Sequence, residues 1–472
     1  MNATTPGGEP VARRSWSQAL KVYGQRPVLS MLFLGFSAGL PFFLVFQTLS
    51  AWLRQDGIER ATIGMLAWVG LVYSVKFLWS PIVDRLQLPL LFRLLGRRRS
   101  WMLVAQVGIG IGLLNLASSD PQAGVMQIAV GALFLAFCSA TQDISIDAWR
   151  IESASVDMQG AMAAAYQLGY RLALITGGAG ALGIAQGYGW ATSYTVMALL
   201  AGVGIVTTLL VREPAVNAAR ESAAREARVV EWLERKAHWP GSLREFGATF
   251  IGAVICPLTD FFARYGMRLA VVTLLLIGSY RLTEFTMGSM ANPFYIDHGY
   301  TLAEIATIVK AIGLPVSMLG VIVGGIIIAK SGLRFALFLG SGLVLASNLG
   351  FALLATTDSP TLVGLGLVNS LDSLAQGVHG TALIAFLSSL TSARYTATQY
   401  ALFSSLYALP GKLLEGTSGF VVDAINYPVF FTYTAALSIP GLLILLWLTR
   451  RRLLDTRGTV AVRDEREVGN VR

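Results

Sequence analysis

The stretch Ser80-Pro-Ile-Val-Asp84-Arg85, followed by Gly96-Arg97-Arg98-Arg99, joins two apolar runs of the chain. The runs span Ala61–Ser80 and Trp101–Ser118, and each is close to the length of about 20 residues that crosses a bilayer as a helix. An acid at the end of one helix can bind a following arginine cluster, and it can also accept hydrogen bonds from a nearby helix N-terminus. We therefore predict two membrane helices joined by a charged turn.

Apolar runs of similar length recur along the rest of the chain. Hydrophobic residues make up 54% of the sequence and charged residues 13%, whereas soluble proteins carry about 25% charged residues. Interruptions by glycine, proline or a single charge are tolerated where neighbouring helices or a water-filled cavity satisfy the backbone. The alternating segments of a β-barrel are not seen, so we predict an all-α polytopic membrane protein with twelve transmembrane helices. The other ten runs span Val28–Ala51, Gly124–Ala148, Met162–Gln186, Ala191–Val211, Leu269–Ala291, Ala303–Ala329, Phe335–Thr356, Thr361–Leu390, Thr398–Val422 and Val429–Leu448.

The charges of the loops predict the orientation of the helices. Arginine and lysine gather in alternate loops and account for the net charge of +9, and cytoplasmic loops are enriched in these residues. We therefore expect both termini in the cytoplasm, and no nucleic-acid partner. In the long middle segment, Ala218–Lys236 alternates arginine with glutamate at helical spacing, which is typical of an amphipathic surface helix. The predicted parts are a cytoplasmic segment 1–27, a six-helix bundle 28–211, a central cytoplasmic loop 212–268, a second six-helix bundle 269–448 and a cytoplasmic tail 449–472.

This division into six and six helices resembles the layout of the major facilitator fold. In that fold a substrate site lies between two related bundles, near the middle of the membrane. The charged turn after the second span resembles the conformational latch of the same superfamily, and the matching turn of the second half, Gly325–Arg334, lacks the acid. The resemblance assigns the latch to Asp84, Arg85, Arg97, Arg98 and Arg99.

Further motifs resemble the AmpG-type muropeptide permeases from the first span to the last. They are Phe77-Leu-Trp-Ser-Pro81, Gly96-Arg-Arg-Arg-Ser-Trp101, Cys138-Ser-Ala-Thr-Gln-Asp143-Ile-Ser-Ile-Asp147-Ala-Trp149, Leu168-Gly-Tyr-Arg171 and Ala397-Thr-Gln-Tyr-Ala-Leu402. The resemblance implies proton-driven uptake of anhydromuropeptides (GlcNAc-1,6-anhydro-MurNAc peptides) from periplasm to cytoplasm, across a bacterial inner membrane, for peptidoglycan recycling. It also implies a link to β-lactam resistance. Some members have two further C-terminal helices, whereas this chain ends in a polar tail after the twelfth predicted span.

Charges inside the predicted spans indicate where a carrier could act. A charge at membrane depth costs roughly 2.5–3.5 kcal/mol on insertion scales, so it usually faces a partner or a cavity. Lys76 and Asp143 fall at similar depth, and Asp147 shares a helix face with Asp143. We predict a Lys76–Asp143 ion pair, which is either static or opened when Asp143 takes a proton. The family resemblance places Gln142, beside Asp143, among the substrate-binding positions.

A second set of charges is predicted near the middle of the membrane, where fold analogy places a cavity. Guanidinium groups bind carboxylates bidentately, so arginines there are candidates to hold the peptide carboxylates of a muropeptide. Alternatively the charges balance one another, Arg281 with Asp372 and Lys412 with Glu415, and substrate could break such pairs. The remaining substrate-binding candidates are Arg171, Arg281 and Lys412, with Tyr170 and Gln47 for sugar rings.

Proton coupling requires a group that can gain and lose a proton inside the membrane. The candidates are Asp143, Glu284, Asp372 and Glu415. Glu284 and Asp372 are favoured slightly because they fall near the predicted substrate site. His379 could also gain and lose a proton near neutral pH, but a single histidine in a span is more often a structural hydrogen-bonding group.

Several other functions are not supported by the sequence. The chain has no GxxxxGK[ST] phosphate loop, no HExxH motif and only two cysteines, so no nucleotide-driven pump, metal site or cofactor is expected. Two alternatives remain: a carrier of another bulky anion, such as an acyl-CoA or a siderophore, and a membrane enzyme acting on lipid-linked sugars. Our main hypothesis is a monomeric carrier, not an enzyme, whose partners are a sugar-peptide, protons and the bilayer.

Overall fold

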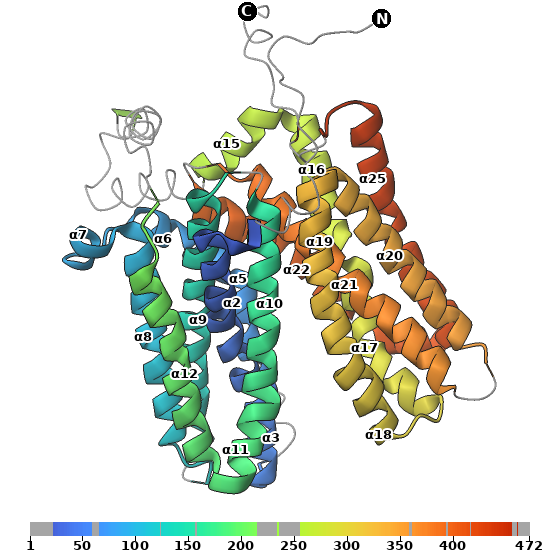
Figure 1. Cartoon of the computed structure of the whole chain (residues 1–472), viewed down its shortest axis with the longest axis horizontal. Coiled ribbons are helices and arrows are strands. Elements are labelled where there is room, and N and C mark those ends of the chain that lie inside the picture. The colour runs from blue at the N-terminus through green and yellow to red at the C-terminus, as the bar shows by residue number, and fades with distance from the viewer. Residues whose placement is uncertain are drawn as a thin grey trace, which may run out of the picture.

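The chain folds into two groups of helices that lie side by side (Figure 1). The computed structural model describes residues 22–58, 66–122, 124–155, 158–214, 234–235, 255–357, 361–392, 395–415, 417–455 and 460. These ranges contain helices and turns and one isolated bridge, between Leu454 and Val460. The all-α prediction is therefore confirmed. Most of Ala218–Lys236, the predicted amphipathic helix, lies outside the described residues.

The N-terminal half, residues 22–214, contains both continuous and broken spans. The first predicted span divides at Phe46 into two helices. The described part of the second span, together with the turn after it, forms four short helices over residues 67–85. The bounds are η1 Val22–Gly24, α2 Arg26–Val45, α3 Gln47–Gln55, η2 Ala67–Gly70, α5 Leu71–Val75, η3 Lys76–Leu78, α6 Ser80–Arg85, α7 Leu91–Leu95, α8 Arg97–Ala117, α9 Val125–Ser153, α10 Gln159–Ile175, η5 Thr176–Gly180, α11 Ala181–Tyr188 and α12 Trp190–Leu210.

The C-terminal half, residues 255–460, also contains both continuous and broken spans. Gly266 and Gly332 each end one helix and precede the next with a positive φ, of 73° and 88°, a conformation that favours glycine. The bounds are α15 Cys256–Tyr265, α16 Met267–Tyr280, α17 Leu282–Asp297, α18 Leu302–Ile305, η7 Ala306–Ile312, α19 Gly313–Ser331, α20 Leu333–Leu354, α21 Leu362–Leu390, α22 Thr396–Glu415, α23 Ser418–Ile425, α24 Tyr427–Ala436 and α25 Ile439–Arg450.

Nine stretches of the described chain are long and apolar enough to cross a membrane. The predicted spans outside this set are the second, tenth and eleventh, which hold the short helices of residues 67–85, α21 and α22. These are spans that carry charges, including Lys76, Asp372 and Lys412. The chain is thus a multi-pass membrane protein. The count of twelve helices and the cytoplasmic termini remain predictions.

The two ends of the molecule differ in charge. One end holds the starts of α8 and α16 and the loop helices α6, α7 and α15 (Figure 1); we call it the arginine end because Arg97, Arg98, Arg99 and Arg150 lie there. At the opposite end lie the turns that follow α3, α8, α11 and α17. The halves contact each other through α10 with α19 and α21, and through α22 with α5, η3, α6 and α9. Near the arginine end an apolar cluster joins them, formed by Val83, Ile144 and Ala148 with Ala397 and Ala401.

Candidate functional site

Asp84 joins the two halves at the arginine end. It follows the second predicted span, and only 2% of it is exposed. Its carboxylate accepts hydrogen bonds from the backbone N–H groups of Ala397 (3.2 Å) and Thr398 (2.7 Å), and from the Thr398 hydroxyl (2.7 Å). These N–H groups begin α22, so an acid of one half caps a helix of the other. Burial by itself raises the pKa of Asp84, but Arg98 and the Thr398 bonds lower it below its usual value.

Arg98 holds Asp84 from the other side. Its Nη2 lies 2.7 Å from Asp84 Oδ1 and 2.6 Å from Glu152 Oε1, at the end of α9. Its Nε donates to Glu152 Oε2 at 3.0 Å. Because this guanidinium is 1% exposed, removing either acid would leave a poorly compensated buried charge, a change that typically costs 3–5 kcal/mol.

The other predicted latch arginines have different positions. Arg97 donates to the backbone carbonyl of Asp84 at 2.9 Å. Arg99 donates to the carbonyls of Thr208 and Leu209, at 2.9 and 2.7 Å, and so ties α8 to α12. Arg85 is the last residue of α6. The structure therefore brings Asp84, Arg97 and Arg98 together and directs Arg99 elsewhere.

Glu213 supports this arrangement, although its role was not evident from the sequence. Its carboxylate accepts from the backbone N–H groups of Arg98 (2.8 Å) and Arg99 (3.1 Å), and so caps α8. Gly96 precedes that helix with a φ of 82°, and a Cβ at Gly96 would come within 2.3 Å of Glu213. Burial raises the pKa of Glu213. The glycine is thus required both by its backbone conformation and by the close approach of this acid.

Arg150 makes a second connection between the halves. It is fully buried on α9; its Nη1 donates to the Ser388 hydroxyl of α21 at 2.6 Å, and its guanidinium lies 5.1 Å from the centre of the Tyr400 ring of α22. Its Nη2 lies 3.3 Å from Asp147 Oδ1. This contact could not be expected from the sequence, because Ser388 and Tyr400 are uncharged. Further bonds join Gln167 Nε2 to Thr381 (3.1 Å) and the Tyr23 hydroxyl to the Ile322 carbonyl (3.3 Å).

Lys76 and Asp143 face each other deeper in the N-terminal half. The distance between Lys76 Nζ and Asp143 Oδ2 is 4.0 Å, and the two side chains are 11% and 15% exposed. Asp143 Oδ1 is buried and makes no hydrogen bond to the described residues. Lys76 also attracts Asp147, one helical turn along α9. The predicted pair is therefore present, but it is long and it satisfies only one oxygen of the carboxylate.

Arginines of both halves approach each other near the middle of the molecule. Arg281 forms a two-pronged ion pair with Glu284, in which Nε donates at 2.6 Å and Nη2 contacts the other oxygen. Arg171, on α10 of the other half, interacts electrostatically with both Arg281 and Glu284, and its Nε is buried without a hydrogen bond to the described residues. Arg171 thus lies within electrostatic range of the Arg281–Glu284 pair and keeps a buried donor that no described residue accepts.

The charge-balancing pairs expected from the sequence are not formed as predicted. Arg281 pairs with Glu284 and not with Asp372, because Glu284 lies one turn along the same helix. Asp372 instead accepts bonds from Ser347 (3.0 Å) and Gln376 (2.6 Å).

Lys412 also departs from its predicted pairing. Its Nζ donates to the Ser74 hydroxyl of the other half at 3.0 Å, while Glu415 interacts with it only electrostatically. Lys412 thus contacts both halves.

Gln142 packs the N-terminal half together. It is fully buried; its Oε1 accepts from the Ser37 hydroxyl (2.8 Å) and its Nε2 donates to the Ser37 carbonyl (3.0 Å). Its predicted contact with substrate stays a prediction, and in the described conformation both ends of its amide are bonded to Ser37. His379 stacks on Tyr280 with ring centres 3.9 Å apart and lies 2.9 Å from the Tyr280 carbonyl, which fits the structural role expected for it.

Aromatic residues lie beside this charged region. Tyr170 lies 6.1 Å from Tyr166 and 6.4 Å from Phe42, between ring centres, and Phe42 lies 5.9 Å from Tyr73. These rings come from α2, α5 and α10, and Tyr170 interacts electrostatically with Asp143. Gln47, the other predicted sugar contact, is exposed at the start of α3.

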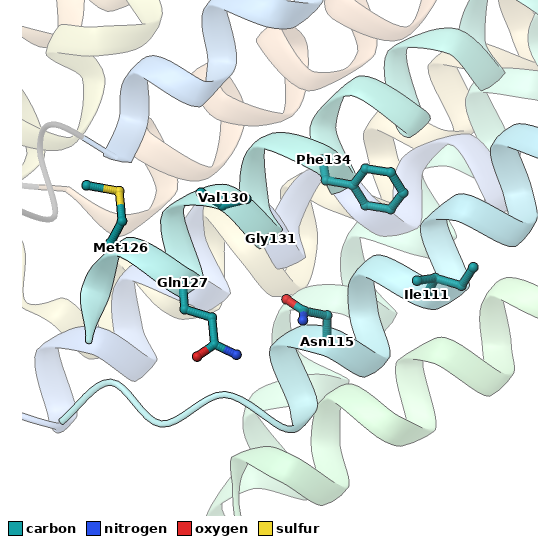
Figure 2. A pocket seen from close by; sticks show the side chains of 7 residues that line it. All are labelled: Ile111, Asn115, Met126, Gln127, Val130, Gly131 and Phe134. Carbon is teal, nitrogen blue, oxygen red and sulfur yellow. The ribbon is translucent and has the colours of Figure 1, made fainter. Parts of the chain in front are cut away.

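A surface groove lies well away from these groups. It separates α8 from α9 and has a volume of about 450 Å³. Figure 2 shows the amides of Asn115 and Gln127 across it, with Phe134 farther along α9. Met126 and Val130 on its wall are 76% and 60% exposed, as expected for a surface that faces lipid. Its lining residues are Ile111, Asn115, Met126, Gln127, Val130, Gly131 and Phe134.

The two-bundle fold and the charges between the halves define a membrane carrier. Residues 31–413 match the family model described as Major Facilitator Superfamily. Solved structures agree on the fold: the proton:xylose symporter XylE superimposes with a TM-score of 0.62 at 13% identity, over 94% of this chain and 98% of that one. The human organic anion transporter MFSD10 (TETRAN) superimposes with a TM-score of 0.61 at 16% identity, over 89% of this chain and 99% of that one.

Relatives found by sequence identify the group within this superfamily. The anhydromuropeptide permease of Escherichia coli (strain K12) is 34% identical over 443 residues, which cover 93% of this chain and 83% of that protein. Putative transporter AmpG 4 of Rickettsia felis is 30% identical over 433 residues, 91% of this chain and 98% of that one. The chain belongs to the AmpG-type muropeptide permeases of the Major Facilitator Superfamily. It is therefore a multi-pass transporter of the bacterial inner membrane and not an enzyme.

Proposed function

We propose that this protein imports anhydromuropeptides from the periplasm to the cytoplasm by alternating access, driven by the proton gradient. The relatives supply the substrate class, since one of them is named an anhydromuropeptide permease. The observation that carries the proposal is the meeting of Arg171 with Arg281 and Glu284 between the halves. Arg171 has a buried guanidinium nitrogen without a partner among the described residues, and such a group at this depth suits a peptide carboxylate of a muropeptide.

In this proposal the arginine end faces the cytoplasm, where loops rich in arginine usually lie. The bonds of Asp84 to the start of α22 then close the cytoplasmic side. The described conformation corresponds to a carrier that receives substrate from the periplasm, and the latch residues stabilise it. Opening requires these bonds to break, so that the six-helix halves rock about the central charges.

The remaining residues take roles around that centre. Lys412 guides the anionic peptide, and its bond to Ser74 is exchanged for a substrate carboxylate. Tyr170 and its neighbouring rings contact the sugars, as aromatic faces do, and Gln47 lies nearer the periplasmic entrance. Asp143 carries the proton, because its carboxylate has one long ion pair and an unsatisfied oxygen. Glu284, Asp372 and Glu415 are secondary candidates for that proton. We propose that the carrier works as a monomer.

Uptake by purified protein tests this function. Proteoliposomes with an alkaline interior should accumulate labelled GlcNAc-1,6-anhydro-MurNAc-tripeptide, and collapsing the pH gradient should abolish the accumulation. Arg171→Ala should weaken substrate binding at least about tenfold, the scale of a lost charge-assisted contact. Arg268→Ala, at an exposed arginine outside the site, should bind and transport normally. Gradient-independent uptake, or stronger competition by an acyl-CoA or a siderophore, would contradict the proposal.

A further inference from the structure

Four charged residues connect the interior of the N-terminal half with the contact between the halves. We propose that Arg150 couples the protonation of Asp143 to the opening of the arginine end, through Lys76 and Asp147. We call these four residues the α9 relay. The inference rests on the proposed proton-coupled function and adds to it the route by which the proton acts on the gate. Arg150 is here a positioning residue, which contacts neither substrate nor proton.

The spacing of the relay follows from one helix. Asp143, Asp147 and Arg150 lie four and three residues apart on α9 and therefore share a face. At about 1.5 Å per residue, Arg150 is about 10 Å nearer the arginine end than Asp143. Lys76 approaches both acids from η3; it lies 4.0 Å from Asp143 Oδ2 and attracts Asp147.

Among the hydrogen bonds and ion pairs between described residues, only those of Arg150 connect the relay to the C-terminal half. Its two terminal nitrogens are divided between the halves, with Nη2 at 3.3 Å from Asp147 and Nη1 at 2.6 Å from Ser388. Nη1 also lies 3.3 Å from Gln159 Oε1, and the guanidinium rests over the Tyr400 ring. Asp147 and Gln159 therefore both hold Arg150 in the orientation that reaches the other half, and Asp147 is the charged one of these two partners.

Protonation changes the balance of charge in the relay. With both acids ionised, two cations face two anions, and each cation has an acid beside it. When Asp143 binds a proton from the periplasmic side, Lys76 loses its partner and Asp147 becomes the one remaining anion for Lys76 and Arg150. Lys76 then competes for Asp147, and the two cations repel each other with less compensation. Arg150 then moves away from Ser388 and Tyr400. The arginine end, which is the gate of the carrier, opens as a result, and Asp143 releases its proton to the cytoplasm.

Other titratable groups around the relay do not offset this change. The groups that interact electrostatically with Asp143 or Asp147 include the hydroxyls of Tyr73, Tyr166, Tyr170 and Tyr400. Buried tyrosines are uncharged at physiological pH. The four relay residues are therefore the ionised groups whose balance changes with the proton.

Distance measurements on the full-length protein in liposomes, without substrate, test the coupling separately from transport. Spin labels would be placed at Leu210→Cys and Met267→Cys, exposed positions at the arginine end of the two halves, after Cys138 and Cys256 are changed to serine. Lowering the pH from 8 to 5.5 should raise the ratio of open to closed molecules in the otherwise wild-type protein. Asp143→Asn should raise this ratio about tenfold at pH 8 and abolish its pH dependence.

The decisive variant is the double change Lys76→Met with Asp143→Asn. Without Lys76 to compete for Asp147, Arg150 should return to Ser388, and the closed population should recover at every pH. Arg150→Lys should favour the open form and lose most of the pH response, because one ammonium cannot span Asp147 and Ser388. Asp120→Asn, at an exposed loop acid, should respond as wild type.

Several results would overturn the relay. It is wrong if Asp143→Asn keeps a pH-dependent gate, if the double variant stays open, or if Arg150→Lys closes and responds as wild type. If Asp143→Asn fails to fold, as judged by size-exclusion chromatography and thermal melting, the Arg150→Lys result decides. Failure of muropeptide uptake in a protein whose gate shows this pattern would contradict the proposed substrate and leave the relay standing.

Discussion

The two ends of this molecule are built differently. At the arginine end, buried charges and hydrogen bonds connect the halves: Asp84 with the start of α22, Arg150 with Ser388, and Gln167 with Thr381. Towards the opposite end, the last bond between described residues of the two halves is that of Lys412 with Ser74. The difference shows that closure depends on contacts near one end, and that these include buried charges whose balance can change.

The largest effect should come from the acid that caps α22. Asp84→Asn removes the charge from a carboxylate that binds Arg98 and two backbone N–H groups. We expect the ratio of closed to open molecules to fall about tenfold or more, because a charged hydrogen-bonded pair is lost. Uptake should be slower, and binding of muropeptide should be unchanged. A strong loss of binding would place Asp84 in the substrate site and contradict the comparison between the ends.

A steric change at the same end should have the next largest effect. A Cβ at Gly160 of α10 would come within 2.4 Å of Ile328 of α19, in the other half. Gly160→Ala should therefore disfavour closure several-fold while leaving each half folded, since overpacking typically costs 1–3 kcal/mol. Gly366→Ala, where no atom lies within 4 Å of the added Cβ, is the matched control. The ratio of closed to open molecules is measured from spin-label distances. An equal change of this ratio in the two variants would show that the Gly160–Ile328 contact does not control closure.

A single neutral hydrogen bond should matter less. Gln167→Leu removes the bond from Gln167 Nε2 to the Thr381 hydroxyl, at 3.1 Å between α10 and α21. Such a bond contributes about 1 kcal/mol, so the ratio of closed to open molecules should fall about fivefold. Thr381→Val should have a similar effect, and the double variant should add little to either one, because the two side chains share the bond. Fully additive effects would contradict the assignment.

The smallest expected effect is the response of the Asp84 contact itself to pH. The pKa of Asp84 is lowered in the folded protein, so its stabilising contribution is present above the unfolded value near 3.9 and is lost as the pH falls through the lowered pKa. In the Lys76→Met, Asp143→Asn variant, the closed fraction should stay constant from pH 8 to 5. A response in that range would assign pH sensitivity to the latch instead of the relay.

The sequence predicted the fold better than it predicted the site. Apolar runs and loop charges indicated the helices, because lipid exposure demands long apolar segments. The breaks at Phe46 and through residues 67–85 were not predicted, since neighbouring helices decide whether a kinked span is satisfied. Charges at membrane depth were easy to recognise, and the Lys76–Asp143 contact was predicted correctly.

The errors concern which partner each group selects. Arg281 binds Glu284 of its own helix, and Lys412 binds Ser74 of the other half. The bonds of Gln142 to Ser37 were not predicted either, and its contact with substrate stays a prediction. Ser388 gave no signal, and Thr398 stood out only as part of the family motif Ala397–Leu402, because a hydroxyl becomes important only when another helix brings a charge to it. Glu152 could have been suspected as an acid that follows a span near the arginine cluster.

The most direct test of the account is to measure both ends of the molecule at once. One spin-label pair at Leu210→Cys and Met267→Cys reports the arginine end, and a second pair at Tyr188→Cys and Phe420→Cys, both highly exposed, reports the opposite end. On addition of anhydromuropeptide at low pH, the first distance should increase while the second decreases. If both distances stay constant or change in the same direction while uptake proceeds, the halves do not rock about the central charges and the account is wrong.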